Sequence, residues 1–373
     1  MKERLRVAIL FGGRSGEHEV SLASAASIVA NLDPERYEVL PIGITKEGRW
    51  VVGADPARAL QAGLDSAELT PVALLPDPTQ RALLTLDGAS GSLSSALGRV
   101  DVVFPVLHGT NGEDGTVQGL LELANVPYVG AGVLGSAVGM DKVTMKDLFV
   151  RHGLPVVEHL AVRRRHWETH PRSVVEQVED VVGYPCFVKP ANLGSSVGVT
   201  KVRSREELVA AMNLAAEYDR KLLVERAVDA REVECGVLGN EEPVASVVGE
   251  VVPRREFYDY QAKYLDEETQ LIIPAQIPEA TAEAIRAMAI RAFKAVGCEG
   301  LARVDFFLTR DTGQVYVNEL NTMPGFTTMS MYPRMWAATG LSFSALLDRL
   351  IELAIERYQD KQRCRTTYDV PSA

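Results

Sequence analysis

The stretch RVDFFLTRDTGQVYVNELN (303–321) decides the fold of this chain, because it predicts two antiparallel strands joined by a tight turn. Side chains alternate faces along a strand, so Arg303 and Asp305 share one face, and Glu319 and Asn321 share a face of the partner strand. Carboxylate and amide oxygens suit Mg²⁺, which binds a few carboxylates together with phosphates and water. An arginine beside such a metal can hold a carboxylate or a developing oxyanion. The alternative is a hairpin with a solvated polar face, and this stretch alone leaves both interpretations open.

The overall composition is that of a soluble globular protein. The chain has 373 residues, 46% hydrophobic and 24% charged, which allows two or three domains. Its formal net charge of −11 argues against nonspecific binding to nucleic acid or to an anionic membrane. No apolar run is long enough to span a bilayer, the N-terminal run VAILF (7–11) is too short for a signal peptide, and the four cysteines are scattered. We therefore expect a cytoplasmic protein with reduced thiols and with neither nucleic acid nor membrane as a partner.

Alternating strands and helices predict a parallel sheet near the N-terminus. Buried strands are expected at 5–11, 37–45 and 100–109, with a helix at 20–32 after the first and another at 117–125 after the last.

The segment 46–100 is less regular, and we expect short hairpins there and a helix near 93–98, with no function assigned. The whole chain divides into three expected units. These are an N-terminal α/β substrate domain (1–140), a central domain with a phosphate-binding loop (141–230) and a C-terminal domain with the magnesium site and a lid loop (231–373).

FVKPANLGSSVGVTKV (187–202) is the best candidate for a phosphate-binding loop. Lys189 precedes a Gly- and Ser-rich loop with a strand on each side, whereas a P-loop places its lysine after the glycines and leads into a helix. Such a loop can close over phosphates with its N–H groups and hydroxyls, and Lys189 adds a positive charge. A simple hairpin is the alternative. The following KLLVERAVDAREVEC (221–235) offers Glu225 and Glu232 for an adenosine, which is weak evidence by itself.

Two glycine-rich turns follow strands of the N-terminal domain. GGRSGEHE (12–19) lacks the GxGxxG spacing, and the next strand does not end in an acid, so a nicotinamide site is disfavoured. Glu17 in this turn could meet an ammonium group, although a solvated first-turn acid is the simpler interpretation. HGTNGEDG (108–115) lies where open α/β sheets place ligands, but a plain surface turn is the default interpretation of this loop taken alone.

Two further loops lie near the predicted magnesium site in the sequence. FYDYQAKYLDEETQ (257–270) is too polar for a core and predicts an active-site lid. NTMPGFTTMSMYP (321–333) places Pro324 and Gly325 just after the predicted metal ligands, where a backbone N–H could serve as an oxyanion donor.

Taken together, these segments resemble the D-alanine–D-alanine ligases of the ATP-grasp superfamily. GGRSGEHEVSL, HGTNGEDG, GSAVGMDK, VKPANLGSSVGVTKV, YDYQAKYLDEETQ, RVDFFL and NELNTMPGFTTMS lie in the order and at the spacing of that family. The resemblance implies an α/β, ATP-grasp fold of three α/β domains, with a Rossmann-like parallel sheet in the first and ATP between the other two. The chain departs from the family in its longer segment 46–100 and in Arg226, where many relatives have lysine.

The resemblance also implies a role for each matching residue. Phosphates would be bound by Lys142, Lys189 and Lys263, and the adenosine by Glu225, Arg226 and Glu232. Two Mg²⁺ ions, for which Mn²⁺ can substitute, would be bound by Asp305, Glu319 and Asn321. The first D-alanine would be bound by Glu17, which Ser195 and Tyr264 hold, with His108 nearby; the oxyanion would be bound by Arg303 and the Gly325 N–H, and the second D-alanine by Ser330 and Met331.

The implied activity is the ATP-dependent joining of two D-alanine molecules through a D-alanyl phosphate, for peptidoglycan precursor synthesis, by a homodimer. A ligase of the same fold that takes D-lactate or D-serine second is the nearest alternative, and Tyr264 favours D-alanine. A nicotinamide oxidoreductase is disfavoured by the glycine spacing. A regulatory protein on an inactive ligase scaffold would be expected to have lost ligands, yet Lys189, Arg303 and Asp305 are all present, as are Glu319 and Asn321.

Overall fold

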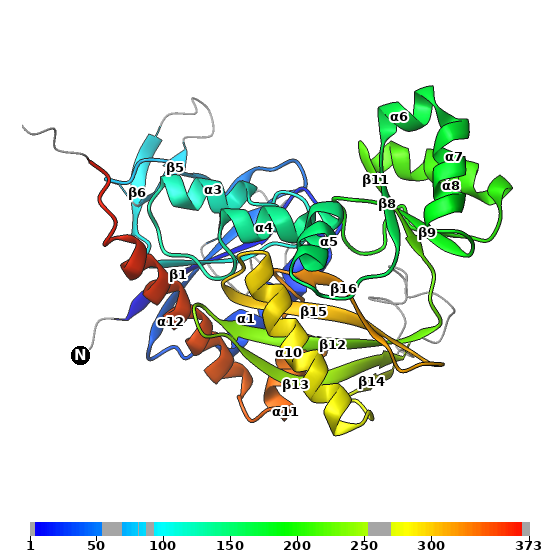
Figure 1. Cartoon of the computed structure of the whole chain (residues 1–373). Helices are drawn as coiled ribbons and strands as arrows, with labels where there is room; N and C mark the ends of the chain where they lie inside the picture. The colour runs from blue at the N-terminus through cyan, green and yellow to red at the C-terminus, as the bar shows by residue number, and fades with distance from the viewer. Residues whose placement is uncertain (1–3, 54–68, 81, 87–92, 253–269, 368–373) are drawn as a thin grey trace, which may run out of the picture.

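Three β-sheets organise the molecule in the computed structural model (Figure 1). The structure describes residues 4–53, 69–80, 82–86, 93–252 and 270–367. The α/β fold class expected from the sequence is confirmed. Within the described residues, no helix combines the length and the apolar character needed to cross a membrane.

The first sheet has a parallel centre and an antiparallel extension. Strands β1, β2 and β7 are parallel, and β1 is buried on both faces. Helices α1 and α12 (Phe343–Lys361) share a core with Val7 and Ile9 on one face, and α3 shares a core with Ala8 and Leu10 on the other. The order across the sheet is β6-β5-β4-β3-β2-β1-β7. The strands are β1 (Leu5–Gly12), β2 (Tyr37–Ile44), β3 (Trp50–Val52), β4 (Thr70–Leu74), β5 (Ala82–Leu86), β6 (Leu93–Arg99) and β7 (Val102–Val106). The helices of this part are α1 (His18–Asn31), α3 (Thr116–Leu123) and α4 (Val133–Met140).

The antiparallel extension corrects one expectation and confirms another. The hairpins expected in 46–100 are present, but the helix expected near 93–98 is wrong, since Leu93–Arg99 is strand β6 paired with β5. Gly98 has φ +99°, a left-handed conformation that interrupts a helix, and the strand instead takes its hydrogen bonds from its neighbour.

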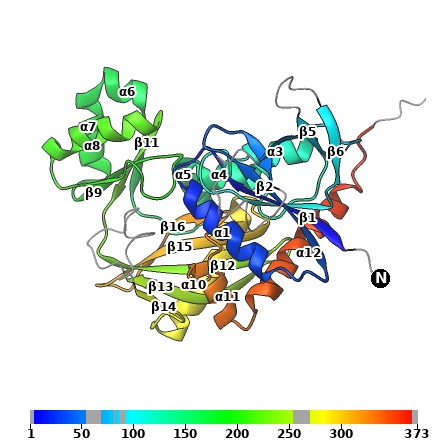
Figure 2. The same cartoon turned by 180° about the vertical axis from the view of Figure 1, so that it is seen from behind.

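The second sheet is antiparallel, in the order β10-β9-β11-β8, and stands apart from the other two sheets in both views (Figures 1 and 2). Its elements, with the helix α5 that precedes them, are α5 (Lys142–Arg151), β8 (His159–Arg163), α6 (Arg164–Thr169), α7 (Pro171–Val181), β9 (Cys186–Pro190), β10 (Thr200–Val202), α8 (Arg205–Tyr218) and β11 (Lys221–Arg226). The Asp141 side chain begins α5 by accepting a hydrogen bond from the Thr144 N–H at 3.0 Å.

The third sheet is also antiparallel, in the order β14-β13-β12-β15-β16, and α10 covers one of its faces. Its elements, with the helices that follow, are β12 (Ala230–Gly239), β13 (Val244–Val252), β14 (Gln270–Ile272), α10 (Glu279–Ala295), β15 (Gly300–Thr309), β16 (Val315–Asn321), α11 (Met331–Ala338) and α12 (Phe343–Lys361).

The C-terminal helix α12 packs against β1, so residues far apart in the sequence share one core. In both views it lies beside β1, and its buried residues Leu346, Leu350 and Ile351 belong to the same hydrophobic core as Val7 and Ile9 (Figure 2). The polar contacts agree, because the Tyr37 hydroxyl donates to Asp348 at 2.8 Å. This packing brings the segment before α11 against the first sheet, where the candidate site lies.

Candidate active site

The expected hairpin forms, and its polar residues face one another. In the pairing of β15 with β16, Arg303 is opposite Asn321 and Asp305 is opposite Glu319. The Arg303 guanidinium donates to both carboxylate oxygens of Asp305, at 2.7 and 2.8 Å, and Asn321 Nδ2 donates to Asp305 at 3.0 Å. Arg303 Nε also lies 3.0 Å from Glu234 of the neighbouring strand β12. Although burial opposes its charge, Asp305 and Glu234 raise the pKa of Arg303 further, so the guanidinium stays charged.

This side-chain set fits a magnesium ion held jointly with phosphates. No three His, Cys, Asp or Glu side chains of the described residues gather as they would in an all-protein metal centre. Mg²⁺, however, commonly uses one or two carboxylates and completes its shell with substrate phosphates and water. Asp305 and Glu319 supply the two carboxylates, and Asn321 supplies an amide.

Lysine and glutamate side chains form a buried group beside this hairpin, which we call the lysine–glutamate cluster: Lys142, Lys146, Lys189, Glu225 and Glu319. Glu225 of β11 forms an ion pair with Lys146, at 2.7 Å, and a second one with Lys189. Lys146 also donates to the Asn318 carbonyl at 2.7 Å, and Lys142 lies 3.2 Å from Glu319 and donates to the Leu193 carbonyl at 2.9 Å. The cluster therefore links α5, β11 and β16 with the predicted phosphate loop.

Burial and mutual charge fix the ionisation of this cluster. Burial opposes a charge on Glu225, but Lys146 and Lys189 outweigh it and lower the pKa of this carboxyl to about 2. Burial lowers the pKa of Lys146, whereas Glu225 and Glu319 raise that of Lys189 against the effect of burial. Lys146 was not predicted from the sequence. The only signal was its place one helical turn after Lys142, which puts both on one face of α5.

The predicted phosphate loop meets the predicted ammonium-binding acid. The Ser195 hydroxyl donates to Glu17, although the two residues are 178 positions apart in the chain. Ser195 has φ +51°, and a Cβ added at Gly194 would lie 2.9 Å from the Glu17 carboxylate. The loop thus approaches the start of α1 so closely that only glycine fits at position 194 without a shift of Glu17.

His108 is buried and holds the segment that contains Gly325. Its Nδ1–H donates to the Met323 carbonyl at 2.9 Å, and the Ser24 hydroxyl lies 3.2 Å from its Nε2. Burial lowers the pKa of His108, only partly offset by Glu17, so the imidazole is neutral. A neutral ring with its proton on Nδ1 matches a carbonyl on one side and a hydroxyl donor on the other.

Glu113 lies in the same loop as His108, and it was not predicted from the sequence as a site residue. Its two carboxyl oxygens accept from the Gly109 N–H at 2.7 Å and from the Met323 N–H at 2.9 Å. Burial and the negative charge of Glu17 raise the pKa of Glu113 to about 8, against the lowering effect of the two N–H donors. We call residues 323–326, which His108 and Glu113 contact, the Met323 segment.

Ser330 and Met331 lie at the start of α11, next to Gly325. Ser330 Oγ accepts from the Thr327 N–H at 3.0 Å, and a Cβ added at Gly325 would come within 2.9 Å of it. The backbone N–H groups of a helix start favour an anion, so a carboxylate can bind here.

The predicted adenosine-binding residues Arg226 and Glu232 differ in their distance from the lysine–glutamate cluster. The Arg226 side chain is more than half exposed and lies 3.4 Å from Glu158, whereas its neighbour Glu225 points into the cluster. Glu232 lies on β12 opposite Phe307, within electrostatic reach of Lys189. Lys263 and Tyr264 lie outside the described residues.

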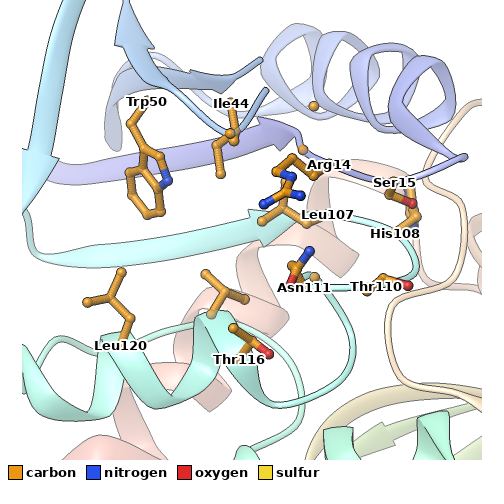
Figure 3. Close-up of a pocket in the computed structure, with 15 residues that line it drawn as sticks. Arg14, Ser15, Ile44, Trp50, Leu107, His108, Thr110, Asn111, Thr116 and Leu120 are labelled. Atoms are coloured by element: carbon orange, nitrogen blue, oxygen red, sulfur yellow. The ribbon is translucent and has the colours of Figure 1, made fainter. Parts of the chain in front are cut away.

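A cavity of about 280 Å³ lies at the carboxyl ends of β1 and β7, beside α3 (Figure 3). Trp50, Ile44 and Leu120 line its apolar end, and Ser15 and His108 lie at the other end. This is the place where open α/β sheets bind ligands, and His108 connects it with the Met323 segment.

Two family models match the chain. The model described as "D-ala D-ala ligase N-terminus" matches residues 6–131, and "D-ala D-ala ligase C-terminus" matches residues 148–352. A D-alanine–D-alanine ligase of Heliobacterium modesticaldum is 53% identical over 96% of this chain and 97% of its own length, and that of Natranaerobius thermophilus is 49% identical over 98% and 99%.

Solved structures agree with these matches. The D-alanine–D-alanine ligase of Coxiella burnetii superposes with a TM-score of 0.83 at 38% identity, over 97% of each chain. The VanG D-Ala:D-Ser ligase of Enterococcus faecalis superposes with a TM-score of 0.84 at 38% identity, over 94% of this chain and all of its own.

Proposed function

Because the chain belongs to the D-alanine–D-alanine ligase family, we propose that it joins two D-alanine molecules at the expense of ATP, for peptidoglycan precursor synthesis. The observation that carries this proposal is the bond between Ser195 of the phosphate loop and Glu17. It brings a phosphate-binding loop against an acid that can hold a substrate ammonium group, as a reaction between ATP and an amino acid requires.

The first step makes the carboxyl group reactive. A carboxylate oxygen of the first D-alanine attacks the γ-phosphorus of ATP, the bond to the β-phosphate oxygen breaks, and ADP leaves a D-alanyl phosphate. Lys142 and Lys189 attract the phosphates, and Glu17 holds the ammonium group in line. Mg²⁺ bound by Asp305, Glu319 and Asn321 would neutralise phosphate charge.

The second step forms the peptide bond. The amine of the second D-alanine, its carboxylate held by Ser330 and the Met331 N–H, loses a proton and attacks the acyl carbon. Arg303 and the Gly325 N–H stabilise the oxyanion, inorganic phosphate leaves, and the dipeptide remains. Arg303 suits this role because Asp305 and Glu234 hold its guanidinium in place.

Several finer points belong to the same proposal. Glu225, Arg226 and Glu232 line the adenosine pocket, Lys263 contacts phosphate, Tyr264 supports Glu17, and His108 lies near the first substrate. The exposed side chain of Arg226 makes its backbone the better candidate for this contact. We also infer the three domains 1–140, 141–230 and 231–373, a cytoplasmic homodimer, and Mn²⁺ as a substitute for Mg²⁺.

A second candidate is a ligase that takes D-serine as the second substrate. The similarity to the VanG D-Ala:D-Ser ligase favours it, whereas the curated relatives at about half identity are D-alanine–D-alanine ligases.

Phosphate release from ATP and Mg²⁺ tests the proposal, first with D-alanine alone and then with D-serine or D-lactate added. We expect phosphate and a dipeptide with D-alanine alone. Phosphate release only in the presence of D-serine or D-lactate would move the specificity to the second candidate. Absence of phosphate release in every mixture would contradict both.

A further inference from the structure

Three contacts from the first 113 residues fix the main chain of the Met323 segment. Glu113 accepts the Met323 N–H at 2.9 Å, and His108 donates to the Met323 carbonyl at 2.9 Å. Ser24 of α1 accepts the Phe326 N–H at 3.2 Å. Gly325 lies between these attachments, so its N–H direction depends on residues that are distant in the sequence.

The packing around the segment agrees with these contacts. Phe326 is fully buried in the core of the first sheet and meets Phe104 of β7 edge to face, with ring centroids 5.9 Å apart. Phe326 therefore fixes one end of the segment. At the other end, before Pro324, Glu113 and His108 bind the Met323 main chain, while the Met323 side chain is buried in the same core as Phe326.

The loop that carries Glu113 is itself rigid. The second Glu113 oxygen accepts from the Gly109 N–H at 2.7 Å. A Cβ added at Gly112 would lie 2.8 Å from the Leu107 main chain, so the loop is tightly folded on its own strand end. A carboxyl group whose two oxygens bind N–H donors of separate segments connects those segments at a fixed distance.

We propose that Glu113 is a positioning residue for the ligation step: by holding the Met323 N–H against the Gly109 N–H, it aims the Gly325 N–H at the developing oxyanion. This inference rests on the proposed function. Glu113 acts on the second step only, because its contacts reach the Met323 segment, whereas the lysine–glutamate cluster serves the first step.

Misdirection of the Gly325 N–H would change the ratio of the two products, whereas a general loss of folded enzyme would lower both products together. If the Gly325 N–H is misdirected, the acyl phosphate still forms but is attacked more slowly by the second amine. Water then competes for it, so phosphate is released without dipeptide. The ratio of dipeptide to phosphate therefore reports the position of the oxyanion donor, independently of how much folded enzyme is present.

Glu113→Gln is the test variant, because glutamine keeps the size but offers one acceptor oxygen to two N–H donors. We expect the ratio of dipeptide to phosphate to fall below that of the unchanged protein. We also expect kcat to fall by about 10- to 100-fold, the scale of a small misplacement, with the KM for ATP within about twofold. Glu113→Asp, which keeps the carboxyl group but shortens its reach, gives the same test if Glu113→Gln does not fold.

Asp114→Asn is the matched control. Asp114 is the adjacent acid, but it accepts from Asn111 and Thr116 N–H groups at 2.8 and 3.0 Å, within its own loop. This variant should keep the ratio of the unchanged protein even if its melting temperature falls.

Ser24→Ala combined with Glu113→Gln adds a further test, since two attachments of one segment should affect the ratio non-additively. A ratio in the Glu113 variants equal to that of the unchanged protein would overturn the positioning role and leave the proposed function intact. If the unchanged protein itself makes no dipeptide, the proposed function fails, and the positioning role fails with it.

Discussion

The lysine–glutamate cluster and the Met323 segment lie on two sides of one site, but different forces hold them. The cluster is held by charges, with Glu225 between two lysines in a buried place. The Met323 segment is held by its own N–H and C=O groups, which bond to Glu113, His108 and Ser24. Charged groups tolerate small shifts because Coulomb attraction falls slowly with distance, whereas hydrogen bonds to main-chain groups fix direction. The comparison indicates that the first step depends on the charges of the cluster, while the second depends on the direction of the Gly325 N–H.

The largest expected effect is the loss of one cation from the cluster. Lys146→Met should leave Glu225 with Lys189 alone and lower the free energy of unfolding by about 3–5 kcal/mol, the usual cost of breaking a buried ion pair. Urea denaturation measures this change.

Lys361→Met is the control for Lys146→Met. Lys361 is exposed and its partner Glu122 is half-buried at the surface, so removal of the lysine should cost less than about 1 kcal/mol. Equal losses for the two variants would show that burial does not strengthen the cluster.

The next effect concerns the oxyanion. Arg303→Ala should lower kcat by about 10²–10³, the usual cost of an oxyanion donor, because it removes both the charge and its fixed position. Steady-state kinetics with D-alanine measures it. Arg310→Ala, in the same hairpin but exposed and paired with Asp229, should leave kcat unchanged. A full kcat in Arg303→Ala would exclude this role.

A smaller effect is expected where the phosphate loop meets Glu17. Ser195→Ala removes a hydrogen bond to a carboxylate, and such bonds contribute about 1.5–3 kcal/mol. We expect the KM for D-alanine to rise by about 10- to 100-fold on that scale, with the KM for ATP much less affected. Ser173→Ala, whose hydroxyl lies in an exposed contact with Gln177, is the control. A KM for D-alanine unchanged by Ser195→Ala would show that the phosphate loop does not contribute to binding of the first substrate.

The smallest effect is a pH dependence of stability that sharpens the comparison. The ordinary pKa of glutamate is 4.5, and burial with Glu17 raises that of Glu113 to about 8. Between these values the folded protein binds a proton that the unfolded chain has lost, so this group makes stability fall as pH rises from about 4.5 to about 8. Glu17, Arg303 and His108 are the charged or titratable groups that act on it or with it.

Glu113→Gln removes this contribution. Between about pH 4.5 and about pH 8, its melting temperature should therefore fall less than that of the unchanged protein. This difference in slope does not depend on which of the two proteins has the higher melting temperature. Asp114→Asn should keep the original slope. Parallel slopes for Glu113→Gln and the unchanged protein would contradict the raised pKa.

Local patterns in the sequence predicted what one strand or one loop determines. The alternation in RVDFFL and YVNELN predicts which side chains share a face of each strand, and the observed pairing brings Asp305 opposite Glu319. The contact of Ser195 with Glu17 was implied by the family resemblance and not by the pattern of the loop itself. The parallel strands β1, β2 and β7 were also predictable, because a strand buried on both faces is a continuous apolar run.

The sequence could not predict what depends on distant partners. Lys146 bonds 172 positions away, Glu113 bonds 210 away, and Ser24 bonds 302 away. The residues next to each of them in the sequence do not indicate a role, because its bonding partner is brought close only by the fold. The strand β6 is a similar case, since pairing with β5 overrides a local preference that had suggested a helix.

The packing of α12 against β1 has a consequence for biosynthesis. Val7 and Ile9 leave the ribosome early, but Leu350 and Ile351 of the same core are made more than 300 residues later. At about 5–20 residues per second, the first sheet waits roughly 20–70 s for the helix that covers it. During this time the part of its apolar face that α12 covers is open to chaperones and to other nascent chains, so a helix made more than 300 residues later completes the core of the first sheet.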